Sequence, residues 1–236
     1  MRRAFGLTLG CLALSACGGG GNDNNGGGSQ VKRAIEPAAQ ERAESMLLTL
    51  SDFPDGWRAN DPAEEDEDED EAFRECVGVD FSALTVIGDA QSDDFTMGEI
   101  AVASSHVQVF ESEQMAAEGV ADYDEALDGE QADTCMTELL GEFEDQEVEI
   151  TRAKVGELSF TPPPGVDDAN AWQVEVTVEG KAGGQAEGLS LTAYVDLVQL
   201  RNGAVAAEVT TTDIATPLDP ELRDQLVAAV AGRMAD

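Results

Sequence analysis

Apolar residues recur with two different periods along this chain, and the two periods separate expected helices from expected strands. Strict alternation over 171–179 places Trp172 and Val174 on one side, which predicts a strand with one buried face. Helical spacing over 221–234 places Leu226 and Val230 on one side, which predicts a C-terminal helix. The same pattern predicts helices over 38–50, from Ser112 onward and over 130–143, and strands over 95–110, 147–160, 189–201 and 204–212.

Turn residues mark where these elements stop. Pro54 disfavours helical geometry in the residue before it, so the first helix should end ahead of it. A tight turn then delivers Trp57, which we expect to fill the core beside that helix. Asn202-Gly203 is a strong two-residue hairpin signal.

The order of elements predicts an α+β domain. We expect an antiparallel sheet of about five strands, with the N- and C-terminal helices packed together on one face. About 200 residues follow the N-terminal stretch, enough for one domain with its own core, so 34–236 should form a single domain.

The N-terminus has the pattern of a bacterial lipoprotein signal. Arg2 and Arg3 precede a short apolar run that ends in Leu14-Ser15-Ala16-Cys17. This run is too short for a spanning helix, which needs about 20 apolar residues, so cleavage is expected. Residues 1–16 are therefore interpreted as a signal peptide and Cys17 as the lipidation site. The alternative is a plain secretory signal with an incidental cysteine.

Residues 17–33 are expected to tether the domain to a membrane. Residues 18–30 are rich in glycine and asparagine and have almost nothing to bury. Two or more acyl chains, such as palmitate, are what stable anchoring requires. The predicted location is the extracytoplasmic face of the cell membrane, held by a lipid anchor.

The formal net charge of −36 excludes a nucleic-acid partner, because that binding relies on basic residues neutralising phosphates. Residues 64–71 are eight acids in a row, and we expect an acidic loop or the fraying start of a helix there. A calcium site is the alternative, but the run lacks the glycine that such a loop needs. No metal and no cofactor is predicted.

Four cysteines occur in the chain. Cys11 would leave with the signal and Cys17 would be acylated, so Cys76 and Cys135 remain to pair in a compartment that permits disulfides.

His106 is the only histidine and the one candidate for a general base. Alternation places Ser104 and His106 on one strand face, which allows a hydrolase hypothesis. No nucleophile turn of the GxSxG kind occurs, so the chain is not expected to be an enzyme.

The segment from Leu47 to Trp57, followed by Cys76, resembles the opening of actinobacterial envelope lipoproteins and is similar to extracellular sensor domains of actinobacterial serine/threonine kinases. Trp172-Gln173-Val174, Arg201-Asn202-Gly203 and the final helix resemble lipoproteins of the PsbP/Mog1-like fold. The resemblance implies an antiparallel sheet with helices on one side and a ligand groove, and it carries over no catalytic residue. The kinase sensor domains have two disulfides, whereas this chain can form one.

Two functional hypotheses follow. The first is a non-catalytic ligand-binding or sensor-like module of the cell envelope, taking a small apolar or amphipathic ligand. The second is an acidic interaction or assembly protein that binds a cationic partner.

Overall fold

The structure, a computed structural model, describes residues 31–62, 67–98, 100–129, 131–141, 148–181 and 187–235. Over these ranges the chain forms a nine-stranded sheet and five α-helices. The strands are β1 (Lys32–Arg33), β2 (Arg58–Asn60), β3 (Thr85–Gln91), β4 (Asp94–Met97), β5 (Ala101–Phe110), β6 (Val148–Glu157), β7 (Asp168–Gly180), β8 (Ser190–Asn202) and β9 (Val205–Ile214). The helices are α1 (Pro37–Met46), α2 (Glu67–Val77), α3 (Glu113–Asp128), α4 (Ala132–Gly141) and α5 (Pro220–Met234), with a short 3-10 helix η1 (Leu50–Asp52).

The sheet is larger than expected and mixed. Its main path runs β1-β3-β5-β9-β8-β7-β6, and β4 joins β2 to β5. The pairing of β1 with β3 is parallel, whereas the others are antiparallel. The expectation of about five antiparallel strands was therefore wrong. The short strands β1 and β2 carry no periodic pattern, β3 was not predicted, and the strand predicted over 95–110 is two strands.

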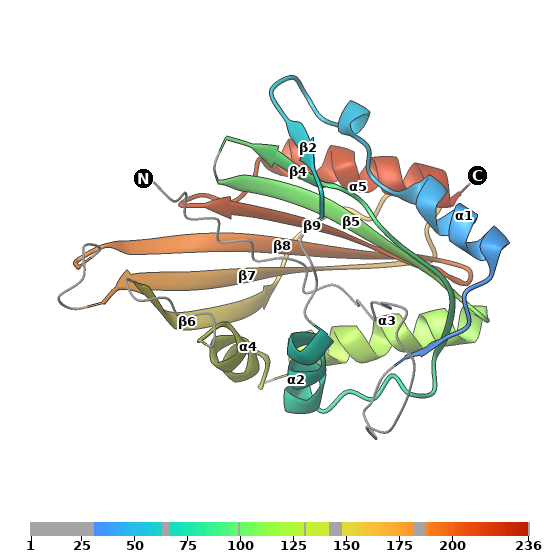
Figure 1. Ribbon diagram of the computed structural model, residues 1–236, viewed down its shortest axis with the longest axis horizontal. Helices are drawn as coiled ribbons and strands as arrows, with labels where there is room; N and C mark the ends of the chain where they lie inside the picture. The colour runs from blue at the N-terminus through green and yellow to red at the C-terminus, as the bar shows by residue number, and fades with distance from the viewer. Residues whose placement is uncertain are drawn as a thin grey trace.

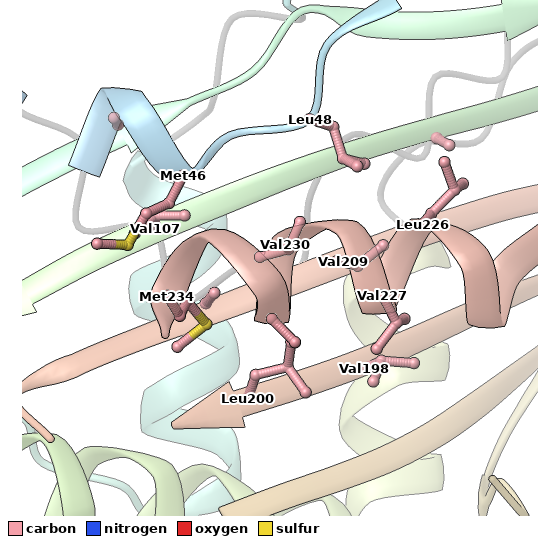
Figure 2. Packing of buried hydrophobic residues seen from close by; sticks show 14 of the residues in the cluster. Met46, Leu48, Val107, Val198, Leu200, Val209, Leu226, Val227, Val230 and Met234 are labelled. Atoms are coloured by element: carbon pink, nitrogen blue, oxygen red, sulfur yellow. The ribbon is translucent and has the colours of Figure 1, made fainter. Parts of the chain in front are cut away.

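Helices cover both faces of the sheet, whereas the sequence predicted helices on one. Figure 1 shows α1 and α5 on one side of the strands and α2, α3 and α4 on the other. The N- and C-terminal helices do share a face, as predicted. Figure 2 shows their common core, in which Met46 of α1 and Val230 of α5 point toward Val107 and Val209 of the sheet.

A close approach of α1 to β3 depends on Gly88. A Cβ atom at this position would lie 2.4 Å from the carbonyl oxygen of Ala39. No real Cβ contact is that short, so the residue that faces α1 here has to be glycine.

The first helix ends at Met46 instead of Leu50. The chain leaves the helix because Leu48 donates its backbone N–H to Ser105 Oγ at 2.9 Å, and Arg233 donates to the carbonyl of Leu47 at 2.9 Å. These long-range bonds, which no local pattern contains, hold residues 47–48 in an extended form. Trp57 is buried beside this segment, as predicted.

The single strand predicted over 95–110 is two strands. Gly98, at a φ of 71°, lies in the turn between β4 and β5. The predicted hairpin between β8 and β9 is present, but its turn lies one residue later than expected. Asn202 ends β8 and pairs with Val205, so Gly203, with a φ of 58°, and Ala204 form the turn. Burial of Trp172, Val174, Val176 and Val178 on one face of β7 is also confirmed.

The disulfide between Cys76 and Cys135 is present and joins α2 to α4. Helix α2 begins at Glu67, inside the acidic run 64–71, so the helical interpretation of that run holds from Glu67 onward and the loop interpretation was wrong there. Residues 64–66 lie outside the described part of the chain.

Helix α4 also closes one edge of the sheet. The strand β6 is the last in the order, so its outer backbone groups have no strand to pair with. Thr137 Oγ1 accepts the N–H of Ala153 at 2.9 Å, and Asp133 Oδ1 accepts the N–H of Val155 at 2.6 Å.

Among the described residues, no helix is long and apolar enough to cross a membrane. The predicted signal peptide, Cys17 and most of the tether lie outside the described residues.

Candidate functional site

The sheet face beneath α3 carries a row of buried polar side chains across three central strands. In the register of the sheet, His106 of β5 lies opposite Glu208 of β9, and Glu208 lies opposite Gln199 of β8. These side chains are 4%, 3% and 1% exposed, respectively. A buried polar row is costly unless its groups are hydrogen-bonded or have a bound molecule, so this row marks the place on the sheet to examine for function.

A small cavity of about 10 Å³ lies at this row. Its polar walls are His106, Gln108, Gln199 and Glu208, and its apolar walls include Val120 of α3 and Ala206 of β9. This volume is close to the minimum that holds one water-sized group.

Two glutamines in the cavity wall have buried amide atoms that lack a hydrogen-bond partner in the part of the chain that the structure describes. Within the described residues, neither amide atom of Gln199 has a hydrogen-bond partner, and the Nε2 of Gln108 has none either. Leaving a buried amide unpaired costs roughly 1–3 kcal/mol, and native interiors rarely keep such groups without a partner. The two side chains therefore offer donors and an acceptor to an occupant of the cavity.

A line of charged groups reaches the cavity from the edge of the sheet. The Oδ1 of Asp89 lies 2.5 Å from Nε2 of His106, and its Oδ2 lies 2.9 Å from a guanidinium nitrogen of Arg33. Arg33 belongs to β1, Asp89 to β3 and His106 to β5. One carboxylate thus joins the first strand of the domain to the cavity wall.

The carboxylates of this line are held in place by their neighbours. Gln40 of α1 fixes the backbone of Asp89 from both sides, donating to its carbonyl at 2.8 Å and accepting from its N–H at 3.1 Å. Thr210 Oγ1 donates to Glu208 Oε1 at 3.0 Å. The arrangement is preorganised, since little of it can move without breaking these bonds.

The hydrolase hypothesis gains no support from this geometry. Ser104 and His106 do share a face, as alternation predicted, but Nε2 of His106 is occupied by Asp89. Ser105 points to the opposite face, where its Oγ accepts the N–H of Leu48. What the arrangement can do is bind a small polar group and respond to charge.

Metal binding has no assembled ligand set in the described ranges, where no three histidine, cysteine or acidic residues gather in a way that could hold an ion. Cys76 and Cys135 are joined to each other, and neither lines the cavity. Cys17 lies outside the described residues, so its lipidation stays a prediction.

Sequence reasoning singled out His106 and missed Gln108, Gln199 and Glu208. The signal that could have found them is the alternation itself. Gln108 follows His106 on the same face of β5, and the Asn202-Gly203 hairpin places Gln199 opposite Glu208. Polar residues on an otherwise apolar strand face indicate a lined cavity once a covering helix is known.

No protein-family model matches the chain, and no curated protein sequence matches it. Among solved structures, the chain is similar to the extracellular domain of PknH from Mycobacterium tuberculosis, with a TM-score of 0.42 and 12% identity, over 84% of this chain and 100% of that one. It is also similar to an uncharacterized protein, the Rv0999 ortholog from Mycobacterium smegmatis, with a TM-score of 0.39 and 13% identity, over 83% of this chain and 96% of that one. These likenesses assign no residue of this chain a role.

Proposed function

We propose that this chain is a non-catalytic, extracytoplasmic lipoprotein, tethered through Cys17, that binds a small ligand in the cavity beneath α3. The observation that carries the binding proposal is that, in the described part of the chain, the Gln199 amide and Nε2 of Gln108 line a cavity without a hydrogen-bond partner. The disulfide between Cys76 and Cys135 supports the location, because disulfides persist in oxidising compartments.

The chemistry of the walls defines the ligand. Glu208 and the overall charge of −36 disfavour an anion. The size of the cavity fits a single hydroxyl or amine group, and Val120 and Ala206 add apolar contact beside it. The ligand is therefore amphipathic, with a neutral or cationic polar end in the cavity. Its remaining part displaces α3 outward.

Native mass spectrometry of the chain purified from its own membranes tests this function. We expect a copurifying small molecule on the native chain and its loss from Gln199→Leu, which removes the amide and keeps a side chain of similar size. Gln114→Leu is the matched control, because Gln114 is exposed on α3, where its Nε2 donates to Glu118 Oε1 at 2.7 Å. Equal retention of the molecule by both variants would refute binding at this cavity.

Stability measurements separate binding from folding. Removing an unpaired buried amide should leave the free energy of unfolding of Gln199→Leu unchanged or higher, since no protein hydrogen bond is lost. A large loss of stability in the ligand-free variant would mean that Gln199 has a structural role instead.

The second candidate function, an acidic interaction protein, is favoured by the outer surface of α3. Burial raises the pKa of Asp122, and the carboxylates of Glu118 and Glu125 raise it further. These three acids repel each other, and a cationic partner would relieve that repulsion. Association through this surface would weaken steeply with ionic strength and would weaken in Asp122→Asn. Salt-insensitive association would exclude it.

A further inference from the structure

The first strand of the domain and the polar cavity share one carboxylate. Arg33 and His106 approach the two oxygens of Asp89, at 2.9 Å and 2.5 Å. Asp89 is 8% exposed at its side chain and His106 is 4% exposed, so water screens this array weakly.

The strand β1 and the residues just after it are attached to β3 by backbone hydrogen bonds. These bonds run from Lys32 N to Leu84 O at 3.0 Å, from Ala34 N to Val86 O at 2.9 Å and from Glu36 N to Ile87 O at 2.7 Å. The strand is two residues long, and the ion pair of Arg33 adds a side-chain contact to these backbone bonds. Any change in the charge facing Arg33 should alter the docking of β1.

We propose that Arg33, Asp89 and His106 form a charge relay through which the protonation state of His106, in the cavity wall, controls how firmly β1 is held on the sheet. This inference rests on the proposed function for the source of the signal, since a ligand in the cavity contacts His106. It goes further because it connects the ligand's effect on His106 to β1, at the end of the predicted tether 17–33.

The direction of the effect follows from the charges around His106. Asp89 faces it from β3 and Glu208 lies opposite it on β9, while Arg33 lies beyond Asp89 on β1. The buried face of α3 contributes Tyr123 as its titratable group. When the imidazole is neutral, Arg33 is the only cation paired with the Asp89 carboxylate among the described residues of this array, so their ion pair is strong. An imidazolium competes with Arg33 for that carboxylate and also repels the guanidinium. Protonation of His106 therefore loosens β1.

A ligand exploits the same balance. A cationic group in the cavity disfavours the imidazolium and so tightens β1, whereas a group that accepts a hydrogen bond from the ring favours the charged form and loosens β1. Through the relay, the charge of the bound group would determine how firmly the sheet holds β1, which lies at the end of the predicted tether 17–33.

Hydrogen exchange on the full-length chain tests the relay. The exchange protection of the peptide spanning 31–36, corrected for the intrinsic pH dependence of exchange, should fall roughly tenfold as His106 becomes protonated. His106→Gln should give a protection that is constant with pH. Because His106 is the only histidine, its titration is followed directly by NMR on isotope-labelled histidine. Protection that stays constant while the ring titrates, or a ring that does not titrate while the chain is folded, would overturn the relay.

If protonation of His106 weakens the contact between Arg33 and Asp89, then that contact must in turn oppose protonation of His106. Removing the guanidinium in Arg33→Gln should move the imidazole titration to higher pH than in the native chain. Arg201→Gln is the matched control, because Arg201 also forms a partly exposed ion pair, with Asp167 at 3.3 Å, on the same sheet. An imidazole titration equal in Arg33→Gln and the native chain would contradict the coupling.

The two proposals fail separately. A chain that shows the β1 response but carries no small molecule from its membranes keeps the relay and loses the binding function. A chain that carries a molecule lost in Gln199→Leu, with β1 protection independent of His106, keeps the binding function and loses the relay.

Discussion

Arg233, near the C-terminal end of α5, holds Asp52 in η1, with one guanidinium nitrogen 2.7 Å from Oδ1 and 2.9 Å from Oδ2 of the carboxylate. The two residues are 181 positions apart, so this pair joins the two ends of the domain. Burial acts to raise the pKa of Asp52, but hydrogen bonds from Arg233 and Thr49 outweigh it, and the pKa lies below its usual value.

This pair makes stability depend on pH in a defined direction. Because the folded pKa of Asp52 is lowered, its stabilisation is fully present above the range near pH 4 where an unfolded aspartate titrates, and it is lost as pH falls through the folded value. Asp52→Asn should cost about 1–2 kcal/mol at pH 7 and much less in strong acid, as measured by urea unfolding. Asp55→Asn, at an exposed neighbouring position, is the control. Equal losses at both pH values would contradict a charged pair.

For Asp124 on α3, stability is predicted to depend on pH in the direction opposite to that for Asp52. Burial raises its pKa, and the nearby carboxylate of Asp128 raises it further. A raised folded pKa means that ionisation opposes folding, so stability falls as pH rises through that value. Asp124→Asn should therefore raise the melting temperature at pH 7 and leave it unchanged well below pH 4. A lower melting temperature at pH 7 would show that the ionised carboxylate stabilises the helix.

Gly88 is predicted to be the least tolerant glycine facing a helix. Gly88→Ala should destabilise the domain by roughly 2 kcal/mol or more, because its Cβ would meet the backbone of Ala39 at 2.4 Å and α1 would have to move. Gly156→Ala on β6 is the matched control, since nothing lies within 4 Å of a Cβ there. Thermal unfolding of the two variants compares them directly, and similar melting temperatures would show that α1 shifts freely.

The disulfide should contribute strongly to stability. It closes a loop between positions 59 residues apart, for which the chain-entropy model gives about 4 kcal/mol. The double variant Cys76→Ser, Cys135→Ser should lose stability of that order in denaturant unfolding. A loss below about 1 kcal/mol would mean that the rest of the fold already fixes α2 against α4.

The sequence predicted those elements of the fold that depend on a local residue pattern. Alternation located β7, Asn202-Gly203 located the β8–β9 hairpin, and Ser112 was correctly expected to begin α3, where it accepts the N–H of Met115 at 3.2 Å. The parallel pairing of β1 was not readable, because two residues carry no period. The end of α1 was missed because it depends on a long-range hydrogen bond. The N–H of Leu48 donates to Oγ of Ser105, which is 57 positions away in the sequence.

The candidate site was readable only in part. His106 could be singled out because it is unique in the sequence. Gln108, Gln199 and Glu208 could not, because a polar residue on a strand ordinarily faces water, and only the placement of α3 over this face turns these side chains into cavity walls.

Helix α4 gives the disulfide a further consequence for the behaviour of the chain in solution. Cys135 lies between Asp133 and Thr137, the two side chains that occupy outward N–H groups of β6. An uncovered sheet edge recruits strands from other molecules. Reduction of the disulfide would free α4 to leave this edge, and the sheet could then grow from one molecule into the next. The covalent link between two helices is thus also a barrier against polymerisation of the domain.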